Sequence, residues 1–171
     1  MTTICLHGPE STGKSTLIPQ LAAQYGTIFI PEYGRTFAER HGTDFTMADL
    51  VEIARTHDAQ TRAARATGAD PLLLDTDPLM TAVWADMLFG ARDPWFDAWQ
   101  GTADLYLLLA IDLPWIDDGT RLFGSAGERR RFFDLSRAEL ERRGVTYAIV
   151  GGQGPARLAA AIAAISAAGF G

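Results

Sequence analysis

Short apolar runs alternate with longer segments of helical period along this chain. Five runs are predicted to be strands, at residues 3–7, 27–31, 72–75, 105–111 and 145–150. These runs are continuously apolar rather than alternating, which is typical of strands covered by helices on both faces. The pattern therefore predicts an α/β fold with a five-stranded parallel sheet.

Seven segments between and after these runs have helical character. Helices are predicted at residues 14–25, 36–41, 46–68, 77–89, 94–100, 126–143 and 155–168. Thr46 and Asp49 have the spacing of a capping box, in which a hydroxyl and a carboxylate bind the first unpaired N–H groups of a helix. Because no repeat, linker or low-complexity tract interrupts the pattern, we expect one domain over residues 1–171. The alanine-rich final helix is expected to pack on the sheet, with a contact in a homo-oligomer as the alternative.

Composition narrows the class of protein. With 171 residues, 47% of them hydrophobic, the chain is long enough for one domain with a core. Its formal net charge of −6 argues against a sequence-independent nucleic-acid binder, which needs a broad basic surface. Cys5 is the only cysteine, no signal peptide is recognisable, and no window approaches the ~20 apolar residues of a membrane span. We therefore expect a cytoplasmic protein with no disulfide and no nucleic-acid or membrane partner.

The strongest motif follows the first predicted strand. Residues 8–15 read GPESTGKS and satisfy the pattern G-x-x-x-x-G-K-[ST] between an apolar strand and a helical segment. In such a loop the backbone N–H groups point inward at phosphate, and the N-terminus of the next helix adds partial positive charge. Lys14, the only lysine beside fourteen arginines, is placed to reach the β- and γ-phosphates of ATP, and Ser15 is placed to bind Mg²⁺. The residues expected to bind ATP are Gly8, Glu10, Ser11, Thr12, Gly13, Lys14, Ser15 and Thr16.

This phosphate-binding loop fixes nucleotide binding but not the reaction. A signalling GTPase would need an N-K-x-D element, yet the chain has no asparagine. A motor or AAA-type ATPase would normally need a longer chain for its lid and oligomer contacts. A small-molecule kinase fits the length, provided that the chain also supplies an acceptor site and a lid.

Acidic residues follow the second and third predicted strands, at Glu32, Asp75 and Asp77. The carboxyl ends of parallel strands form the edge of the sheet where ligands bind. Carboxylates at this edge can hold the magnesium shell or accept a proton from an attacking hydroxyl. We expect Glu32 and Asp75 to be catalytic and to bind substrate, with Asp75 also a metal ligand beside Ser15. Glu32 as a helix N-terminal acid and Asp77 as an N-cap are the alternatives.

Three further residues are candidates for binding the acceptor. Trp84 lies about two helical turns after Asp77, where its ring could stack on a flat or cationic ring. Tyr33 and Arg35 lie beside Glu32, and Arg35 could bind a carboxylate, a ribose or a phosphate. Core packing of Trp84 and surface pairing of Arg35 are the alternatives.

A lid is predicted at about residues 112–135. Five of the fourteen arginines lie within residues 121–137, and such guanidinium groups neutralise a transferring phosphoryl and exclude water when a lid closes. Arg121 and Arg129 are the catalytic candidates, with a solvated helix face as the alternative. Gly152, in a glycine-rich corner after the last strand, is predicted to hold adenine through main-chain groups. The three histidines are expected to be structural.

Several longer stretches of the chain carry a family resemblance. They are GPESTGKSTL, PEYGRTF, LLLDTDPLMTAVWADMLFG, DLYLLLAIDLPWIDDGTR with RRRF, and YAIVGG. Together they resemble the ribosylnicotinamide kinase domain of NadR-like proteins, over about residues 2–160. The resemblance implies a nucleoside-kinase-like P-loop fold and the ATP-dependent phosphorylation of the ribose 5′-hydroxyl of nicotinamide riboside, giving nicotinamide mononucleotide in NAD salvage. By position it implies that residues 8–16 hold the ATP phosphates, that Asp75 and Asp77 face the riboside, and that Trp84 is a plate for the cationic pyridinium.

The chain also departs from the full-length proteins of that family. Those proteins carry a nucleotidylyltransferase domain, and some carry a DNA-binding helix-turn-helix. Neither fits in 171 residues, and no [HT]-x-G-H motif is present. We therefore expect a stand-alone kinase. Another P-loop nucleoside or nucleotide kinase, and an ATPase interaction module without a small-molecule acceptor, are the alternatives.

Overall fold

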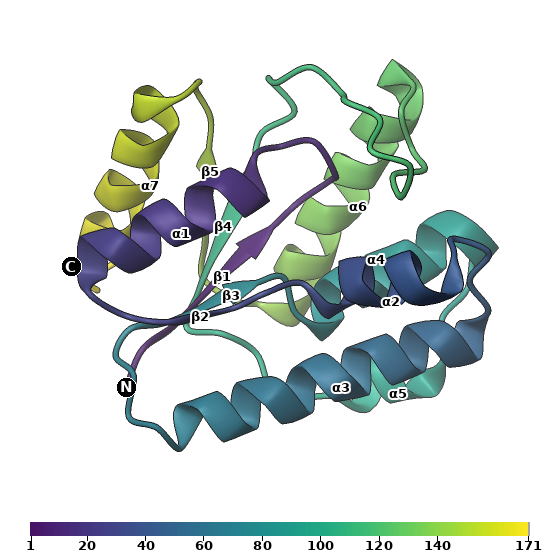
Figure 1. Ribbon diagram of the computed structural model, residues 1–171, viewed down its shortest axis with the longest axis horizontal. Coiled ribbons are helices and arrows are strands. Elements are labelled where there is room, and N and C mark those ends of the chain that lie inside the picture. The colour runs from purple at the N-terminus through teal and green to yellow at the C-terminus, as the bar shows by residue number, and fades with distance from the viewer. Residues whose placement is uncertain (171) are drawn as a thin grey trace.

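A parallel sheet lies between two layers of helices in the computed structural model, which describes residues 1–170 (Figure 1). The strand order is β2-β3-β1-β4-β5, and every neighbouring pair is parallel. The strands are β1 (Thr3–His7), β2 (Phe29–Ile30), β3 (Leu72–Asp75), β4 (Leu105–Leu109) and β5 (Tyr147–Val150). The predicted five-stranded parallel sheet is confirmed. β2 is shorter than predicted because, at the edge of the sheet, only Phe29 and Ile30 pair with β3.

Seven helices connect and cover the strands. They are α1 (Lys14–Tyr25), α2 (Tyr33–His41), α3 (Met47–Arg65), α4 (Pro78–Phe89), α5 (Pro94–Ala98), α6 (Ala126–Arg143) and α7 (Pro155–Ala167). All seven predicted helices are present, and the capping box of Thr46 and Asp49 starts α3. Two bounds differ by three residues, since α2 begins three residues earlier than predicted and α3 ends three residues earlier. The start of α2 was missed because glycine has a low helix propensity and Gly34 lies in its first turn. In the structure Glu32 is extended and is the N-cap, so the helix begins at the next residue.

Alternate residues of the central strands face opposite helical layers. In β4, Leu107 and Leu109 pack with α1 and α7, whereas Tyr106 and Leu108 pack with α4 and α6. Every residue of β1 and β4 is buried, which explains the continuous apolar runs in the sequence. Figure 1 shows the central strands running between α1 and α7 on one side and α4 and α6 on the other. Among the described residues, no helix combines the length and apolar character needed to cross a membrane.

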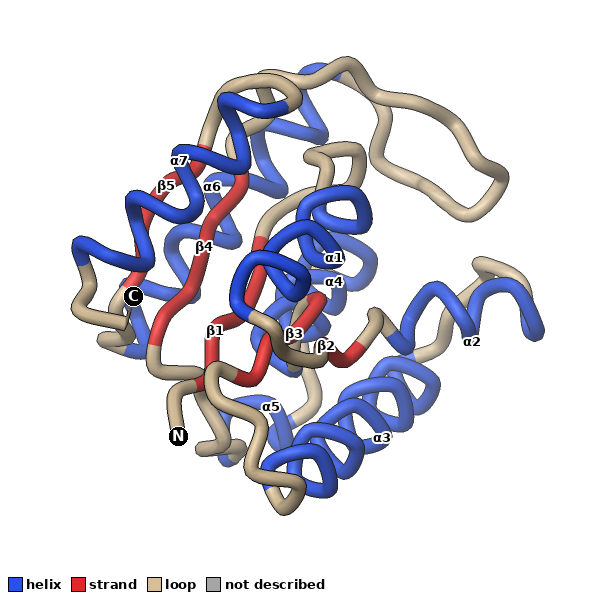
Figure 2. Tube along the Cα trace, turned by 60° about the vertical axis from the view of Figure 1, so that its left-hand side comes forward, coloured by secondary structure: helices blue, strands red, loops and turns tan. Residues whose placement is uncertain are grey.

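The segment predicted to be a lid has two parts. Residues 110–125 form an irregular connection that leaves the end of β4 and passes the loop between β1 and α1 (green in Figure 1, tan in Figure 2). The second part is the start of α6, where Phe132 and Phe133 are buried against the main body. The C-terminal end of the predicted lid is thus anchored in the core, and a closing movement of residues 112–125 stays a prediction.

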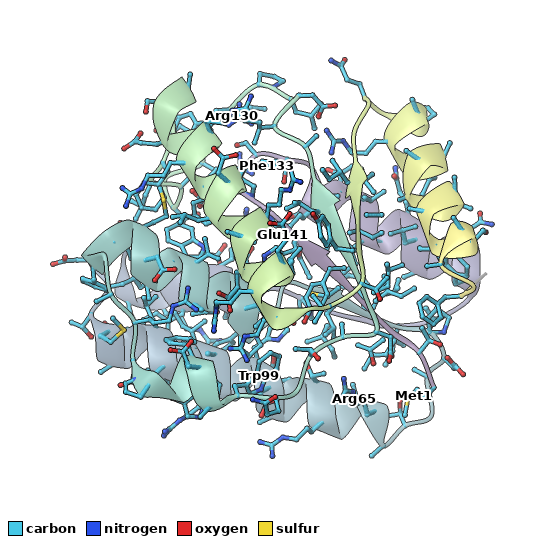
Figure 3. The ribbon with its side chains drawn as sticks, turned by 180° about the vertical axis from the view of Figure 1, so that it is seen from behind. Met1, Arg65, Trp99, Arg130, Phe133 and Glu141 are labelled. Atoms are coloured by element: carbon cyan, nitrogen blue, oxygen red, sulfur yellow. The ribbon has the colours of Figure 1, made fainter. Side chains whose placement is uncertain are left out.

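A buried ion network fixes the other end of α6. Glu139 is only 3% exposed, and it accepts hydrogen bonds from Arg92 (2.9 Å), Arg142 (2.8 Å) and Arg143 (3.1 Å). Arg143 also donates to the backbone oxygen of Trp99, which lies beyond the C-terminal end of α6 in Figure 3. Burial raises the pKa of Glu139, but the three guanidinium groups outweigh it and hold the pKa below its usual value. The network ties α6 to α4 and α5 and so holds one wall of the domain in place.

We predict that Glu139→Ala lowers the free energy of unfolding by about 3–5 kcal/mol, because it removes the buried carboxylate that pairs with the largely buried guanidinium groups of Arg92 and Arg143. Urea unfolding followed by circular dichroism measures the change. Glu141→Ala on the same helix is the matched control, since the exposed Glu141 pairs with Arg137 at the surface. Its effect should be much smaller. Equal losses for the two variants would contradict the structural role of the buried network.

Candidate functional site

One cavity lies over the carboxyl ends of the strands, where four loops meet. Its floor is the loop between β1 and α1, and its walls come from the start of α2, one face of α3, the start of α4 and the end of the irregular connection. The lining residues used below are Glu10, Ser11, Lys14, Ser15, Glu32, Tyr33, Arg35, Phe45, Leu50, Ile53, His57, Thr76, Met80, Thr81, Trp84, Thr120 and Arg121. The structure therefore brings the predicted phosphate loop, part of the predicted acceptor side and one lid arginine together.

The loop between β1 and α1 has the backbone that phosphate binding requires. Gly8 has φ +122° and Gly13 has φ +83°, and a Cβ on Gly8 would lie 3.1 Å from the backbone oxygen of Leu109. Only glycine fits at such a place. The ammonium of Lys14 donates to the backbone oxygens of Gly8 (2.8 Å) and Pro9 (2.6 Å), so the side chain folds over the loop. Burial lowers its pKa, against the attraction of Glu32, Asp75 and Glu10.

The two predicted catalytic carboxylates follow β2 and β3, which lie on the same side of β1 in the sheet. Glu32 is the N-cap of α2, yet its side chain makes no capping hydrogen bond and lines the cavity. Asp75 is the last residue of β3 and is 5% exposed. It does not line the cavity itself, but the next residue, Thr76, does, and Thr76 has φ +69°. Its Oδ1 has no hydrogen-bond partner among residues 1–170. Burial and the charge of Glu32 raise the pKa of Asp75 to about 7, against Lys14 and Arg35.

Asp77 has the N-cap position that the sequence left open. It accepts hydrogen bonds from the backbone N–H of Leu79 (2.9 Å) and from the hydroxyl of Tyr106. The side chain is buried and does not line the cavity. The geometry therefore favours a structural role, and contact of Asp77 with an acceptor stays untested.

Trp84 lies in an aromatic cluster at the cavity wall. Its ring centroid is 5.2 Å from that of Phe123, 5.3 Å from that of Phe132 and 6.3 Å from that of Phe45. Trp84 and Phe45 line the cavity, so Trp84 both packs in a cluster and offers surface to a ligand. Phe123 belongs to the irregular connection, and through it the position of that connection is coupled to the acceptor side.

The irregular connection is docked on the phosphate loop. Arg121 lines the cavity and donates to the hydroxyl of Ser11 (2.8 Å), and Arg129 donates to the backbone oxygen of Ser11 (3.3 Å) without lining the cavity. The backbone N–H of Leu122 donates to Glu10 (3.0 Å). Burial raises the pKa of Glu10 to about 7, against that hydrogen bond. The two loop residues Glu10 and Ser11 thus hold the connection over the floor of the cavity.

Arg35 is paired across the cavity mouth. Its guanidinium lies 3.2 Å from Asp118, which also contacts Arg121 at 3.2 Å. Tyr33 lines the cavity beside it. Arg35 therefore pairs with Asp118 and also lines the cavity, where a ligand can reach it.

The predicted adenine corner is held by two residues that the sequence did not single out. Asp112 accepts a hydrogen bond from the backbone N–H of Gly152 (2.6 Å), and the buried Arg157 donates to the oxygen of Gly152 (2.9 Å) and pairs with Asp112. A Cβ on Gly13 would lie 3.7 Å from Arg157. The start of the irregular connection, the glycine corner and the phosphate loop are therefore one connected structure. In the sequence, the available signal for Arg157 was that it is the one charged residue in the largely apolar final helix.

His57, Thr76 and Thr120 also line the cavity without having been predicted to do so. His7 and His41 lie outside the lining, as expected. Within residues 1–170, no three His, Cys, Asp or Glu side chains form a metal-binding group. Ser15 and Asp75 therefore fit only a cation that takes its other ligands from phosphate oxygens and water, as Mg²⁺ does.

Comparison with known proteins gives consistent results. A family described as AAA domain matches residues 3–157. The trifunctional NAD biosynthesis/regulator protein NadR of Escherichia coli is 30% identical over 151 residues, which are 85% of this chain and 37% of that protein. The NadR protein of Salmonella typhimurium shows the same identity and coverage. This chain thus spans little more than a third of the curated relatives it matches.

Solved structures confirm the fold. The crystal structure of NadR protein in complex with NR matches with a TM-score of 0.83 and 25% identity, over 97% of this chain and 51% of that one. NadR in complex with NAD and AMP-PNP matches with a TM-score of 0.78 and 23% identity, over 97% and 49%. Deoxyadenosine kinase from M. mycoides matches with a TM-score of 0.69 and 10% identity, over 97% and 100%, which shows the fold alone. The predicted P-loop kinase fold and the resemblance to NadR-like proteins are both confirmed.

The raised pKa of Asp75 predicts a pH-dependent cost in the ligand-free protein. A carboxyl whose pKa is higher in the folded than in the unfolded state loses stability as the pH rises toward the folded value. We expect Asp75→Asn to be more stable than the parent by an amount that grows from about pH 4 to about pH 7 and then levels off, reaching about 1–3 kcal/mol. Thermal unfolding over this pH range measures it.

Asp44→Asn is the matched control, because Asp44 is exposed. Its free energy of unfolding should differ from that of the parent by less than about 0.5 kcal/mol, because an exposed side chain makes few contacts. Parallel pH profiles for the Asp75→Asn variant and the parent would show that Asp75 is not held at a raised pKa.

Proposed function

The chain belongs to the AAA domain family that matches residues 3–157, and we propose that it is an ATP-dependent kinase that phosphorylates the ribose 5′-hydroxyl of nicotinamide riboside to give nicotinamide mononucleotide. One observation carries the proposal: a single cavity joins a complete phosphate loop, the carboxylate of Glu32 and the aromatic wall of Trp84. The similarity to NadR over most of this chain supports it, because NadR has been solved in complex with NR and with AMP-PNP.

The acceptor side suits a flat, cationic base. Trp84 and Phe45 offer aromatic faces, which attract a cation by their negative electrostatic potential. Glu10, Glu32 and Asp75 place three carboxylates near the same cavity, so its field favours positive charge. A pyridinium riboside meets both conditions, with its base against the aromatic wall and its 5′-hydroxyl toward the phosphate loop.

Phosphoryl transfer then follows from the positions of the charged groups. The 5′-oxygen attacks the γ-phosphorus, the bond to the ADP oxygen breaks, and the hydroxyl proton passes to a carboxylate. Glu32 and Asp75 are the candidates, and a pKa near 7 suits Asp75 to take up a proton at neutral pH. Lys14 stabilises the charge on the phosphates, and Arg121, which contacts Ser11 of the phosphate loop and lines the cavity, can cover the transferred group.

Ser15 and Asp75 are the residues that would hold Mg²⁺. When bound, Mg²⁺ neutralises phosphate charge and fixes the geometry of the phosphate chain. The need for Mg²⁺, a cytoplasmic location, the absence of nucleic-acid partners and the oligomeric state stay predictions of the sequence.

The central test is ADP release from the purified protein with ATP, Mg²⁺ and a panel of nucleosides. We expect turnover that depends on nicotinamide riboside and yields nicotinamide mononucleotide by mass spectrometry. Lys14→Arg should lower kcat by at least about a hundredfold, because a forked guanidinium cannot replace the compact ammonium. Turnover only with another nucleoside would favour a different nucleoside kinase. ATP hydrolysis without a phosphorylated acceptor would contradict both kinase functions.

Trp84→Ala is expected to raise the KM for nicotinamide riboside about tenfold or more, because a desolvated cation–π contact contributes about 1–2 kcal/mol. The KM for ATP should change by less than about twofold. Trp95→Ala is the matched control, since Trp95 packs with Phe96 and does not line the cavity. Equal increases of both KM values in Trp84→Ala would show that the residue acts only by packing.

A further inference from the structure

Arg157 is a charged side chain buried at the start of the largely apolar helix α7. It is 3% exposed, and its guanidinium has three partners: it donates to the backbone oxygens of Gly152 (2.9 Å) and Val150 (3.3 Å) and pairs with Asp112. A buried ion pair adds little stability over well-packed apolar side chains, because both charges lose their hydration. Stability alone therefore does not account for Arg157.

The pair of Arg157 and Asp112 shapes the glycine corner of residues 151–154. The N–H of Gly152 donates to Asp112 (2.6 Å) while its oxygen accepts from Arg157, so both main-chain groups of Gly152 are engaged within the protein. A Cβ on Gly151 would lie 3.0 Å from Oδ2 of Asp112, and one on Gly152 would lie 3.3 Å from the backbone nitrogen of Arg157. The two glycines thus leave the room that the carboxylate and the start of α7 occupy.

The stem of Arg157 also contacts the phosphate loop. A Cβ on Gly13 would lie 3.7 Å from Cδ of Arg157 and 3.2 Å from a methyl group of Leu113. Gly13 precedes Lys14 and is the N-cap of α1, with φ +83°. One side chain therefore joins the phosphate loop, which its stem contacts, to the glycine corner, which its guanidinium holds.

The order of the strands indicates which substrate meets this corner. The cavity opens beside the ends of β2 and β3, whereas Asp112 and Gly152 follow β4 and β5 on the other side of β1. In phosphoryl transfer the attacking and the leaving oxygen lie roughly in line, on opposite sides of the phosphorus. If the acceptor occupies the cavity, the ADP portion of the donor extends toward β4 and β5, so its base lies toward the glycine corner.

We propose that Arg157 and Asp112 are positioning residues for the donor nucleotide: together they hold the glycine corner, at a fixed distance from the phosphate loop, in the shape that receives the base of ATP. A corner that is ordered before the nucleotide arrives spares the entropy cost of ordering it on binding. The two residues act on the nucleoside half of the donor and not on its phosphates, which the loop binds. This role goes beyond the proposed function and rests on it only in taking ATP as the donor.

Arg157→Met tests this role, because methionine keeps an unbranched stem against Gly13 but loses every guanidinium contact. We expect the Kd for the ATP analogue AMP-PNP with Mg²⁺, measured by calorimetry, to rise about tenfold, since binding must then order the corner. The Kd for inorganic triphosphate, which has no base, should change by less than about twofold. Unchanged Kd values for both ligands would overturn the proposal. Equal rises would overturn it too, since they would place the effect in the phosphate loop.

Asp112→Ala tests the same pair from its more accessible partner, whose side chain is 40% exposed. It should weaken the binding of AMP-PNP but not that of triphosphate. The double variant should lose little more affinity than Arg157→Met alone, because the effects of two residues that act as one pair are not additive. Full additivity would show that the two residues act independently and would contradict the proposal.

Arg143→Met is the matched control. The side chain of Arg143 is 8% exposed, pairs with Glu139 and donates to the backbone oxygen of Trp99, so the same kind of contacts is lost at the C-terminal end of α6. This variant should melt at a lower temperature and keep the parent ratio of the two Kd values. A selective loss of AMP-PNP affinity in Arg143→Met as well would show that the loss reports general destabilisation, and the proposal would be wrong.

Failure of the proposed function is recognised separately, because these binding measurements need neither riboside nor turnover. If AMP-PNP shows the selective loss but riboside is not phosphorylated, then the kinase function is wrong and the positioning role stands. If riboside is phosphorylated but Arg157→Met keeps the parent KM for ATP, then the positioning role is wrong and the kinase stands.

Discussion

The close approach of Gly8 to the backbone of Leu109 is the constraint on which the site depends. Because no side chain fits between them, the chain can turn there directly from the central strand into the phosphate loop. β1 lies between β3 and β4, so the turn opens between the ends of these two strands. Asp75 then lies on one side of the loop and Asp112 on the other. The position of β1 between these strands therefore determines where both the acceptor side and the predicted adenine corner lie.

The sequence predicted the parts of the structure that local pattern controls. Continuous apolar runs marked the strands because both faces of β1 and β4 are covered, and the glycine spacing marked the loop because its backbone admits few residues. Asp77 was ambiguous, since a residue before Pro78 is a good N-cap whether or not it also faces a ligand. His57 could not be predicted as a lining residue, because it continues an apolar helix face.

The electrostatic character of the cavity bears on how the two proposed substrates would bind. Three carboxylates, from Glu10, Glu32 and Asp75, lie near one ammonium, and burial raises the pKa of two of them. Such an arrangement is unfavourable while the cavity holds only water. Under the proposed function, a cationic riboside and Mg²⁺ would offset this repulsion and so contribute to their own binding.

The hydrogen bonds of Ser11 bear on the rate at which a nucleotide could exchange. Its hydroxyl oxygen accepts a hydrogen bond from Arg121, and its backbone oxygen accepts one from Arg129. Asp112 and Arg157 hold the other end of the same connection. The connection is thus held at both of its ends where it crosses the phosphate loop. If the predicted lid must open for a nucleotide to enter or leave, the exchange rate depends on the few hydrogen bonds that Ser11 accepts, and lid openings of this kind take microseconds to milliseconds.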